Sequence, residues 1–243
     1  MIDLEKLKNQ RVKMNIDDKE INNFDSFAYE WWNKRGPYKL IHNLTPIRVS
    51  YIEQNIDVNG LKILDIGCGG GILAEELTKK GAIVTGLDAL KKTVKVAQNH
   101  AKEQKLNIKY LDKSLDEHID SSNEKYDVVI CFELIEHVPD QMKLIQDISS
   151  VCKKGTKIFI STINRNIISF ALAKIMAEYV LKIVPEGTHQ YKKFLKPSEL
   201  VKMLDIAKFK MSDIKGVTLN PIDYSFSLSS ITKINYFMVA TKK

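Results

Sequence analysis

The chain has 243 residues, 44% of them hydrophobic and 28% charged, a composition ordinary for a globular protein and sufficient for one α/β domain with a full core. The first residues, Met1–Lys6, hold no apolar run, and Cys68, Cys131 and Cys152 show no paired spacing, so we expect no secretory signal peptide and reduced thiols in a cytoplasmic protein. The net charge of +7 would suit nucleic acid or an anionic membrane, but the lysines are scattered and the charge alone selects no partner.

The N-terminal part predicts two helices before any sheet begins. Residues 1–20 are charged and weakly periodic, as in a frayed helix or a tail. Aromatic side chains then follow at helical spacing: Phe24, Phe27, Trp31 and Trp32. We expect a helix that docks this aromatic face on the main sheet and also serves as a lid over a cofactor. Residues 40–52 predict a second helix with Pro46 near its start. Arg48 on this helix is interpreted either as a surface residue or as a clamp for the carboxylate of a bound amino acid.

A strand, a glycine-rich turn and a helix follow between residues 61 and 77. The apolar run 61–66 predicts a buried parallel strand, and Gly67-Cys68-Gly69-Gly70-Gly71 lets the backbone approach a ligand closely. A second strand, 82–88, ends at Asp88, which comes 21 residues after Gly67, the usual distance for a carboxylate that takes ribose hydroxyls. The pattern predicts the first unit of a nucleotide-binding α/β sheet.

The details of the glycine turn favour one class of cofactor. Ile72 stands where the dinucleotide pattern needs its third glycine. Asp65, at the tip of the first strand, would repel a pyrophosphate but suits an α-ammonium group. Both features favour S-adenosylmethionine and disfavour the alternative, an NAD-dependent oxidoreductase on the same unit. The stretch Leu64–Gly71, together with Gly86-Leu87-Asp88, resembles motif I and the following acidic position of class I methyltransferases.

Two further parallel strands are predicted at 107–111 and 126–131, separated from the second strand by a helix at 90–104. Acids and hydroxyls after the third strand are candidates for contact with an adenine edge, with no choice among them: Asp112, Ser114 and Asp116. Because ligands of open parallel sheets collect beyond the carboxyl ends of the strands, we expect residues 132–137 to face the cofactor.

Glu133, Glu136 and His137 are spaced i, i+3, i+4, which would bring them onto one face of a helix. Two carboxylates and an imidazole there would bind a divalent ion, Mg²⁺ or Mn²⁺. Such an ion would hold both oxygens of a catechol and lower the pKa of the one to be methylated. The alternative is a helix start with a purely structural role. A metal-bound phenolate is the preferred route to deprotonation, and His137 or His189 is the candidate base without a metal.

The C-terminal half adds an unusual insertion. A helix at 141–151 and a strand at 156–161 are followed by a long apolar segment, 166–184, whose three charges form one stripe and argue against a transmembrane helix. The segment is interpreted as a buried helix or as an interfacial helix that is flanked by lysines suited to anionic lipid: Lys192, Lys193 and Lys196. A last helix opening at 196–200 and strands at 213–219 and 234–240 predict an antiparallel hairpin that closes the sheet.

Three stretches together give a more specific resemblance. The aromatic-Trp-Trp and Leu-Thr-Pro-Ile-Arg preface, Ser161–Arg165 and Pro185–His189 closely resemble the family of ubiquinone biosynthesis O-methyltransferases, from about residue 20 to near the C-terminus. The resemblance implies methyl transfer to hydroxyls of a polyprenylated catechol, at both O-methylation steps of the pathway. It also implies that Arg48 contacts the methionine part of the cofactor, that Phe132 lines its pocket, and that the Glu-x-x-Glu-His residues bind metal as in related mitochondrial enzymes.

We therefore predict one Rossmann-like domain with a seven-stranded, mostly parallel sheet and helices on both faces. Its expected parts are an N-terminal helical cover (1–55), a cofactor-binding core (56–164), a substrate or membrane insertion containing an amphipathic helix (165–196) and a C-terminal helix and hairpin (197–243). The expected partners are a polyprenylated phenol, anionic membrane lipid at the inner face of the cytoplasmic membrane, and other enzymes of the pathway, but no nucleic acid. Two alternatives remain beside the oxidoreductase: a methyltransferase for another small phenol, and a lipid-surface protein with a vestigial site.

Overall fold

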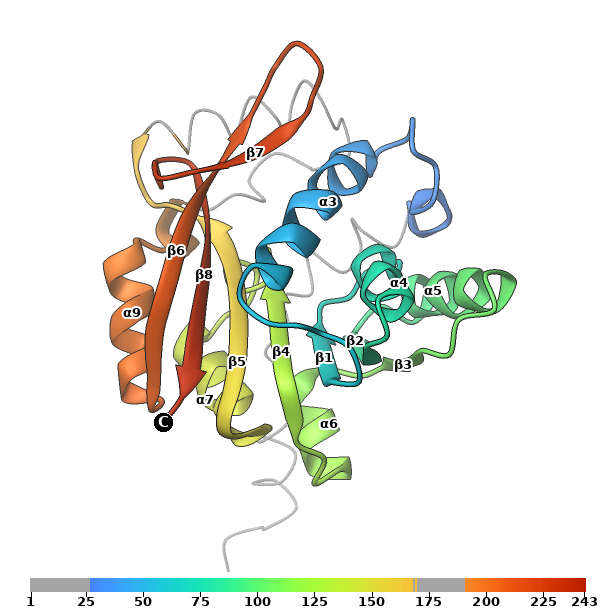
Figure 1. Ribbon diagram of the computed structural model, residues 1–243, viewed down its shortest axis with the longest axis horizontal. Helices are drawn as coiled ribbons and strands as arrows, with labels where there is room; N and C mark the ends of the chain where they lie inside the picture. Colours follow the sequence, from blue (N-terminus) through green and yellow to red (C-terminus); the bar gives the residue numbers. More distant parts are fainter. Residues whose placement is uncertain (1–26, 168, 170–190) are drawn as a thin grey trace, which may run out of the picture.

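The computed structural model describes residues 27–167, 169 and 191–243, and these fold around one twisted sheet (Figure 1). The strand order is β3-β2-β1-β4-β5-β8-β6-β7. Strands β1 to β5 pair in parallel, whereas β6, β7 and β8 pair antiparallel. In chain order the strands are β1 (Lys62–Ile66), β2 (Ile83–Asp88), β3 (Lys109–Asp112), β4 (Tyr126–Phe132), β5 (Cys152–Ile163), β6 (Phe209–Leu219), β7 (Phe226–Ser229) and β8 (Asn235–Lys242).

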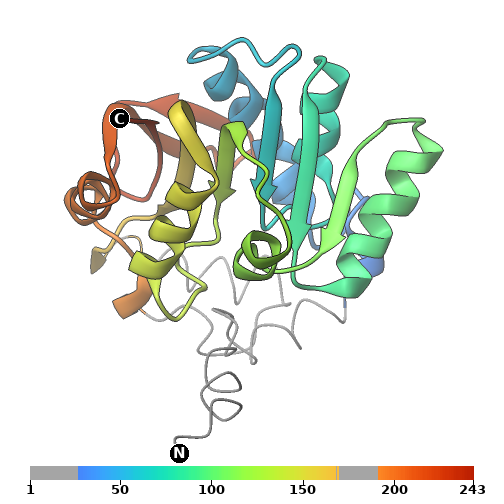
Figure 2. The same cartoon turned by 90° about the horizontal axis from the view of Figure 1, so that it is seen from below.

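Helices cover both faces of the sheet (Figure 2). The described helices are the 3₁₀ turn η1 (Ala28–Glu30), α3 (Lys39–Glu53), α4 (Ile72–Lys79), α5 (Lys91–Glu103), α6 (Leu115–Ser121), α7 (Gln141–Ser150), the 3₁₀ turn η3 (Tyr191–Lys193) and α9 (Pro197–Ile206). Along β4, Val129 and Cys131 join the core under α6, α7 and α9, while Val128 and Ile130 join the core under α3, α4 and α5. Burial on both faces explains why the parallel strands are almost continuously apolar.

The predicted fold class is confirmed, with one additional strand. The expected C-terminal hairpin is present as β6 and β8, and β8 also pairs with β5 along the register from Lys157↔Thr241 to Ile163↔Asn235. The eighth strand, β7, pairs with the end of β6. This strand follows the turn-rich segment 220–225. It has only four residues, which are too few to give a periodic pattern in the sequence.

Two helix predictions need correction. The helix expected over residues 24–33 is wrong in its described part, where η1 spans Ala28–Glu30 and is followed by turns. Pro46 does not lie near a helix start, because α3 already begins at Lys39. Beside the proline, the hydroxyl of Thr45 donates to the carbonyl of Ile41 over 2.8 Å and gives this turn an additional hydrogen bond.

The predicted amphipathic helix falls almost entirely on residues 168 and 170–190, outside the described part of the chain. Among the helices in the described ranges, none combines the length and the apolar character that crossing a bilayer requires.

The close packing of Gly86 against Tyr110 and Cys68 gives a first test of the fold. A Cβ at Gly86 of β2 would lie 2.7 Å from Cδ1 of Tyr110 and 2.9 Å from Sγ of Cys68. We expect Gly86→Ala to lower the free energy of unfolding by about 1–3 kcal/mol, the range for overpacked cores, as measured by urea unfolding. Ile83→Ala, on the same strand but 57% exposed, should cost about 1 kcal/mol or less. An unchanged midpoint in Gly86→Ala would contradict the packing described.

Candidate active site

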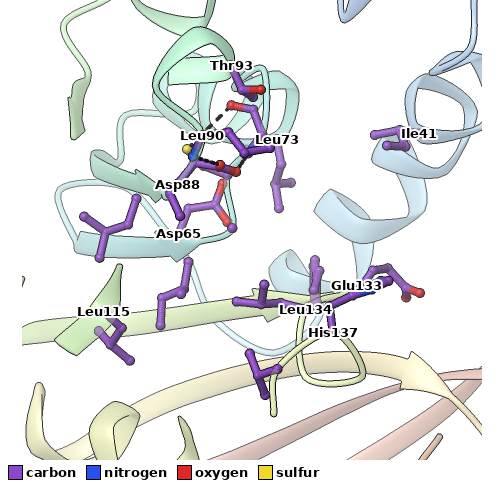
Figure 3. Close-up of a pocket in the computed structure, with 18 of the residues that line it drawn as sticks. Ile41, Asp65, Leu73, Asp88, Leu90, Thr93, Leu115, Glu133, Leu134 and His137 are labelled. Carbon is purple, nitrogen blue, oxygen red and sulfur yellow. Dashed lines mark hydrogen bonds between the residues drawn. The ribbon is translucent and has the colours of Figure 1, made fainter. Parts of the chain in front are cut away.

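A cavity of about 480 Å³ opens at the carboxyl ends of β1, β2 and β4 (Figure 3). Its walls come from the glycine turn, the start of α5, helix α3 and the segment after β4, with contributions from β7 and β8. Of the three candidates for an adenine edge, Ser114 and Asp116 line the cavity, whereas Asp112 is exposed and does not. The position agrees with the rule that open parallel sheets bind ligands beyond the carboxyl ends of their strands.

Asp88 fixes the shape of the glycine turn as well as lining the cavity. Its carboxylate accepts hydrogen bonds from the backbone N–H of Gly69 over 3.0 Å and from that of Leu90 over 2.9 Å. Burial raises the pKa of Asp88, while these two donors oppose the rise. Gly67 also lines the cavity, with its N–H bound to the carbonyl of Leu87 over 2.8 Å. Of the four cofactor residues that the sequence predicts, Gly67 and Asp88 therefore both line this cavity.

Arg48 and Asp65 are two buried charged residues that line the cavity. Arg48 of α3 is 7% exposed and Asp65 of β1 is 3% exposed. Within the described part of the chain, Nε of Arg48 and Oδ2 of Asp65 have no hydrogen-bond partner. Burial raises the pKa of Asp65 to about 7, although the Arg48 cation opposes the rise. Burial likewise lowers the pKa of Arg48, and the carboxylates of Glu133 and Asp65 oppose that change.

These two unsatisfied groups fit a zwitterionic ligand. A carboxylate beside Arg48 and an ammonium group beside Asp65 would satisfy both buried charges. Phe132 completes this part of the cavity: its ring lies 5.4 Å from the guanidinium carbon of Arg48 and stacks on Phe237 at 5.3 Å. The arrangement fits the charges of an amino acid such as the methionine part of S-adenosylmethionine, and Asp88 lines the same cavity.

The predicted metal site is not formed. Residues 133–138 make turns rather than a helix, so the i, i+3, i+4 spacing does not bring Glu133, Glu136 and His137 onto one helical face. Glu133 has a positive φ of 51°, and Val138 precedes Pro139, which disfavours helical backbone there. Among the described residues, no three His, Cys, Asp or Glu side chains are grouped so that they could hold a metal ion.

The two glutamates instead make different contacts. Glu136 is 4% exposed, accepts a hydrogen bond from the hydroxyl of Thr162 over 2.8 Å, and has its pKa raised by burial. Glu133 lines the cavity and accepts from the hydroxyl of Ser161 over 2.7 Å. His137 also lines the cavity, as Figure 3 shows beside Leu134 and Glu133, whereas His189 lies outside the described residues. Glu136 is thus a buried structural carboxyl, whereas Glu133 and His137 both line the cavity.

The two tryptophans form a clasp over the glycine turn, which we call the Trp clasp (Trp31 and Trp32). The indole N–H of Trp32 donates to the carbonyl of Gly70 over 3.0 Å. Trp31 packs so closely that a Cβ on Gly69 would lie 2.4 Å from its ring. Trp31 also lines the cavity and stacks on Tyr38 with ring centroids 3.9 Å apart. The aromatic segment thus packs on the glycine turn through turns instead of a helix, and its role as a lid over a cofactor stays a prediction.

Two histidines hold the Trp clasp in place. Nε2 of His42, on α3, lies 2.8 Å from the carbonyl oxygen of Trp31. The imidazole of His100, on α5, stacks on Trp32 at 3.4 Å, and its Nδ1 lies 2.7 Å from Oε1 of the fully buried Glu75. The Trp clasp is therefore anchored to α3 through His42 and to α5 through His100.

Some site residues carry no signal in the sequence. Asn235, at the start of β8, lines the cavity, but no motif in the sequence around it marks it as a site residue. Tyr38 is 5% exposed behind Trp31, and burial, reinforced by the charge of Asp88, raises its pKa to about 12. Ser161 is part of a stretch used for the family resemblance, but only the structure shows its contact with Glu133.

Comparisons with known proteins agree with this geometry. Residues 47–212 match a family model described as a methyltransferase domain. The ubiquinone biosynthesis O-methyltransferase of Coxiella burnetii (strain RSA 331) is 41% identical over 229 residues, covering 94% of this chain and 97% of the relative. The protein of the same name from Vibrio parahaemolyticus is 43% identical over 230 residues, with the same coverage. Among solved structures, magnesium protoporphyrin IX methyltransferase from Synechocystis PCC 6803 with bound SAH has a TM-score of 0.69 at 20% identity, covering 93% of this chain and 100% of that one.

The Trp clasp can be tested through its anchor. His100→Ala removes the described partner of the buried carboxylate of Glu75, and we expect the free energy of unfolding to fall by about 1–3 kcal/mol. The emission of the chain's two tryptophans, both in the clasp, should shift to longer wavelength as Trp32 becomes exposed. Adding Glu75→Gln should recover part of the stability, because a buried amide is less unfavourable than an unpaired carboxylate. Unchanged emission in His100→Ala would contradict the anchoring role.

Proposed function

The chain belongs to the family of ubiquinone biosynthesis O-methyltransferases, and from this membership we propose that it transfers the methyl group of S-adenosylmethionine to phenolic hydroxyls of polyprenylated catechol intermediates. The proposal covers both O-methylation steps of ubiquinone biosynthesis. The observation that carries it is the pair of buried, unsatisfied charges of Arg48 and Asp65 beside Asp88, which together match the charges and the ribose of this cofactor.

In this proposal each wall of the cavity has one role. Arg48 binds the carboxylate of the methionine part, Asp65 binds its ammonium group, and Asp88 binds the ribose hydroxyls. Gly67 and Phe132 shape the pocket around them. The cofactor supplies a methyl group on a sulfonium cation, which is already a strong electrophile. The protein therefore has to orient the acceptor, exclude water and remove one proton.

His137 is our candidate for the residue that takes this proton. Its side chain lines the cavity next to Leu134, and its backbone N–H donates to the carbonyl of Leu134 over 2.9 Å, which fixes the turn that carries it. A ring nitrogen of His137 would accept the phenolic proton as the oxygen attacks the methyl carbon. No step is assigned to a metal ion, because the Glu-x-x-Glu-His residues do not form a ligand set.

The function can be tested by transfer of labelled methyl from S-adenosylmethionine to a short-chain prenylated catechol. We expect transfer by the wild-type protein and about 10- to 150-fold weaker cofactor affinity in Asp88→Ala, the equivalent of losing a hydrogen bond to a charged group. Asp88→Asn, which keeps an oxygen acceptor for the turn, separates loss of the ribose contact from collapse of the loop. Asp112→Ala, at the end of the neighbouring strand, should leave affinity unchanged. Equal affinity in wild type and Asp88→Ala would contradict the cofactor assignment, and transfer to simple phenols alone would favour another small phenolic substrate.

We further propose that the 165–196 insertion brings the protein to the membrane surface, where a polyprenyl substrate resides. The described residues that flank it support this. A second hollow on the surface is lined by three basic residues, Arg165, Lys196 and Lys233, and by Ile167, which is 81% exposed. Lys192 is exposed beside them. Basic and apolar residues on one surface are the combination that binds anionic bilayers.

Membrane association can be measured by sedimentation with liposomes. We expect binding to anionic vesicles, weak binding to neutral vesicles and release at high salt, because each lysine adds about 1 kcal/mol near an anionic surface and salt screens this attraction. Replacing three lysines together by glutamate should reduce binding: Lys192, Lys193 and Lys196. The matched control replaces three exposed lysines of α5: Lys91, Lys95 and Lys102. Wild-type protein that stays in the supernatant at low salt would show that the insertion does not bind membranes by itself.

A further inference from the structure

We propose that Glu133 and Asn235 together bind the second oxygen of the acceptor, so that the enzyme selects phenols with two adjacent oxygens without a metal ion. This inference rests on the proposed function and names the residues that give the same site its specificity. Glu133 follows β4 and Asn235 opens β8, and both line the cavity.

Glu133 lies apart from Asp65 and Asp88, the two carboxylates assigned to the cofactor. Figure 3 draws it beside Leu134 and His137, away from the group formed by Asp65 and Asp88. Apolar side chains of α3 and β7 line the cavity as well: Leu40, Ile41, Leu44 and Phe226. Apolar walls with a few fixed polar groups are the usual composition of a site for a flat organic ring. An aromatic acceptor held among these apolar side chains would present its oxygens to His137 and Glu133.

Glu133 is held in its place by several contacts. Its backbone has φ +51°, a conformation uncommon for a residue with a side chain and enriched at functional sites. The hydroxyl of Ser161 donates to Oε1 over 2.7 Å, and the N–H of Glu133 donates back to the oxygens of Ser161, 3.1 Å from Oγ and 3.2 Å from the carbonyl oxygen. These contacts tie one carboxylate oxygen to β5 and fix the direction of the other.

Asn235 supplies the second half of the pair. Its Nδ2 lies 3.4 Å from both carboxylate oxygens of Glu133, which orients the amide so that nitrogen faces the carboxylate. Its Oδ1 is buried and has no hydrogen-bond partner among the described residues. This leaves two acceptors side by side. The only described hydrogen bond to Oε2 of Glu133 is the long one from Asn235, and Oδ1 of Asn235 has no described donor.

The chemistry of this pair matches a hydroxyl next to the reacting oxygen. Phenolic hydroxyls donate hydrogen bonds, and a site that leaves a buried acceptor unpaired discriminates strongly against analogues that lack the donor. When the reacting hydroxyl gives its proton to His137, the adjacent hydroxyl would donate to Glu133 or to Oδ1 of Asn235. A monophenol would leave these acceptors unsatisfied. The pair therefore performs the selection that the sequence suggests for a metal ion.

The test compares two acceptors with the same short prenyl chain, a catechol and a monophenol, in wild type, Glu133→Gln and Asn235→Ala. We expect wild type to favour the catechol in kcat/KM by at least about tenfold. In both variants the ratio of kcat/KM for the catechol to kcat/KM for the monophenol should fall by about tenfold or more. Asn235→Ala should leave the calorimetric affinity for S-adenosylhomocysteine unchanged, whereas Glu133→Gln also removes a charge that acts on Arg48 and is therefore judged by the ratio alone. The matched controls, Glu76→Gln and Asn107→Ala, lie on the surface outside the cavity and should keep the preference.

Three results would overturn the inference. A catechol preference that survives in both variants would show that neither residue reads the second oxygen. A preference that disappears from wild type after exhaustive chelation would assign the selection to a metal ion. Transfer to neither acceptor by wild type would contradict the proposed function itself and the inference with it. Thermal unfolding shows whether each variant folds. If one of the two variants does not fold, the result from the other variant tests the inference.

Discussion

The site depends on the interaction between the buried guanidinium of Arg48 and the carboxylates around it. A cation at this depth is unfavourable unless negative charge surrounds it, and the carboxylates of Glu133, Asp65 and Glu136 are the groups whose charges stabilise it. Two of these carboxylates also accept a hydrogen bond, Glu133 from Ser161 and Glu136 from Thr162, whereas Asp65 keeps one oxygen without a described partner. The site is therefore a set of buried charges whose geometry fits a zwitterionic ligand, and burial raises the pKa of Asp65 and of Glu136.

The central sheet could be predicted because its signal is local and repeated. Apolar runs of five to seven residues, a glycine turn at 67–71 and Asp88 at the end of β2 are properties of neighbouring residues, and they specified the parallel half of the fold. The same holds for Arg48 and Phe132, which the family resemblance located and the structure places together. Each of these predictions needed only spacing along the chain or a motif of contiguous residues.

The remainder depends on contacts between distant segments. Asn235 reaches Glu133 across 102 positions in the sequence, and no local pattern marks it. The spacing of Glu133, Glu136 and His137 predicts a helix, but the positive φ of Glu133 and the restriction imposed by Pro139 prevent one. The Trp clasp shows the same limit: Trp31 and Trp32 fall at helical spacing, yet each side chain is held by a partner elsewhere in the chain. Tertiary contacts thus decided the details on which the metal hypothesis depended.

The insertion of β8 between β5 and β6 links two parts of the cavity mechanically. Phe237 of β8 stacks on Phe132, whose ring lies beside Arg48, and Asn235 of the same strand contacts Glu133. Because Asn235 and Phe237 are two positions apart in a strand, their side chains point to the same face of the sheet. A shift of β8 against β5 would therefore move the neighbours of Phe132 and of Glu133 together, so these two parts of the cavity cannot change shape independently.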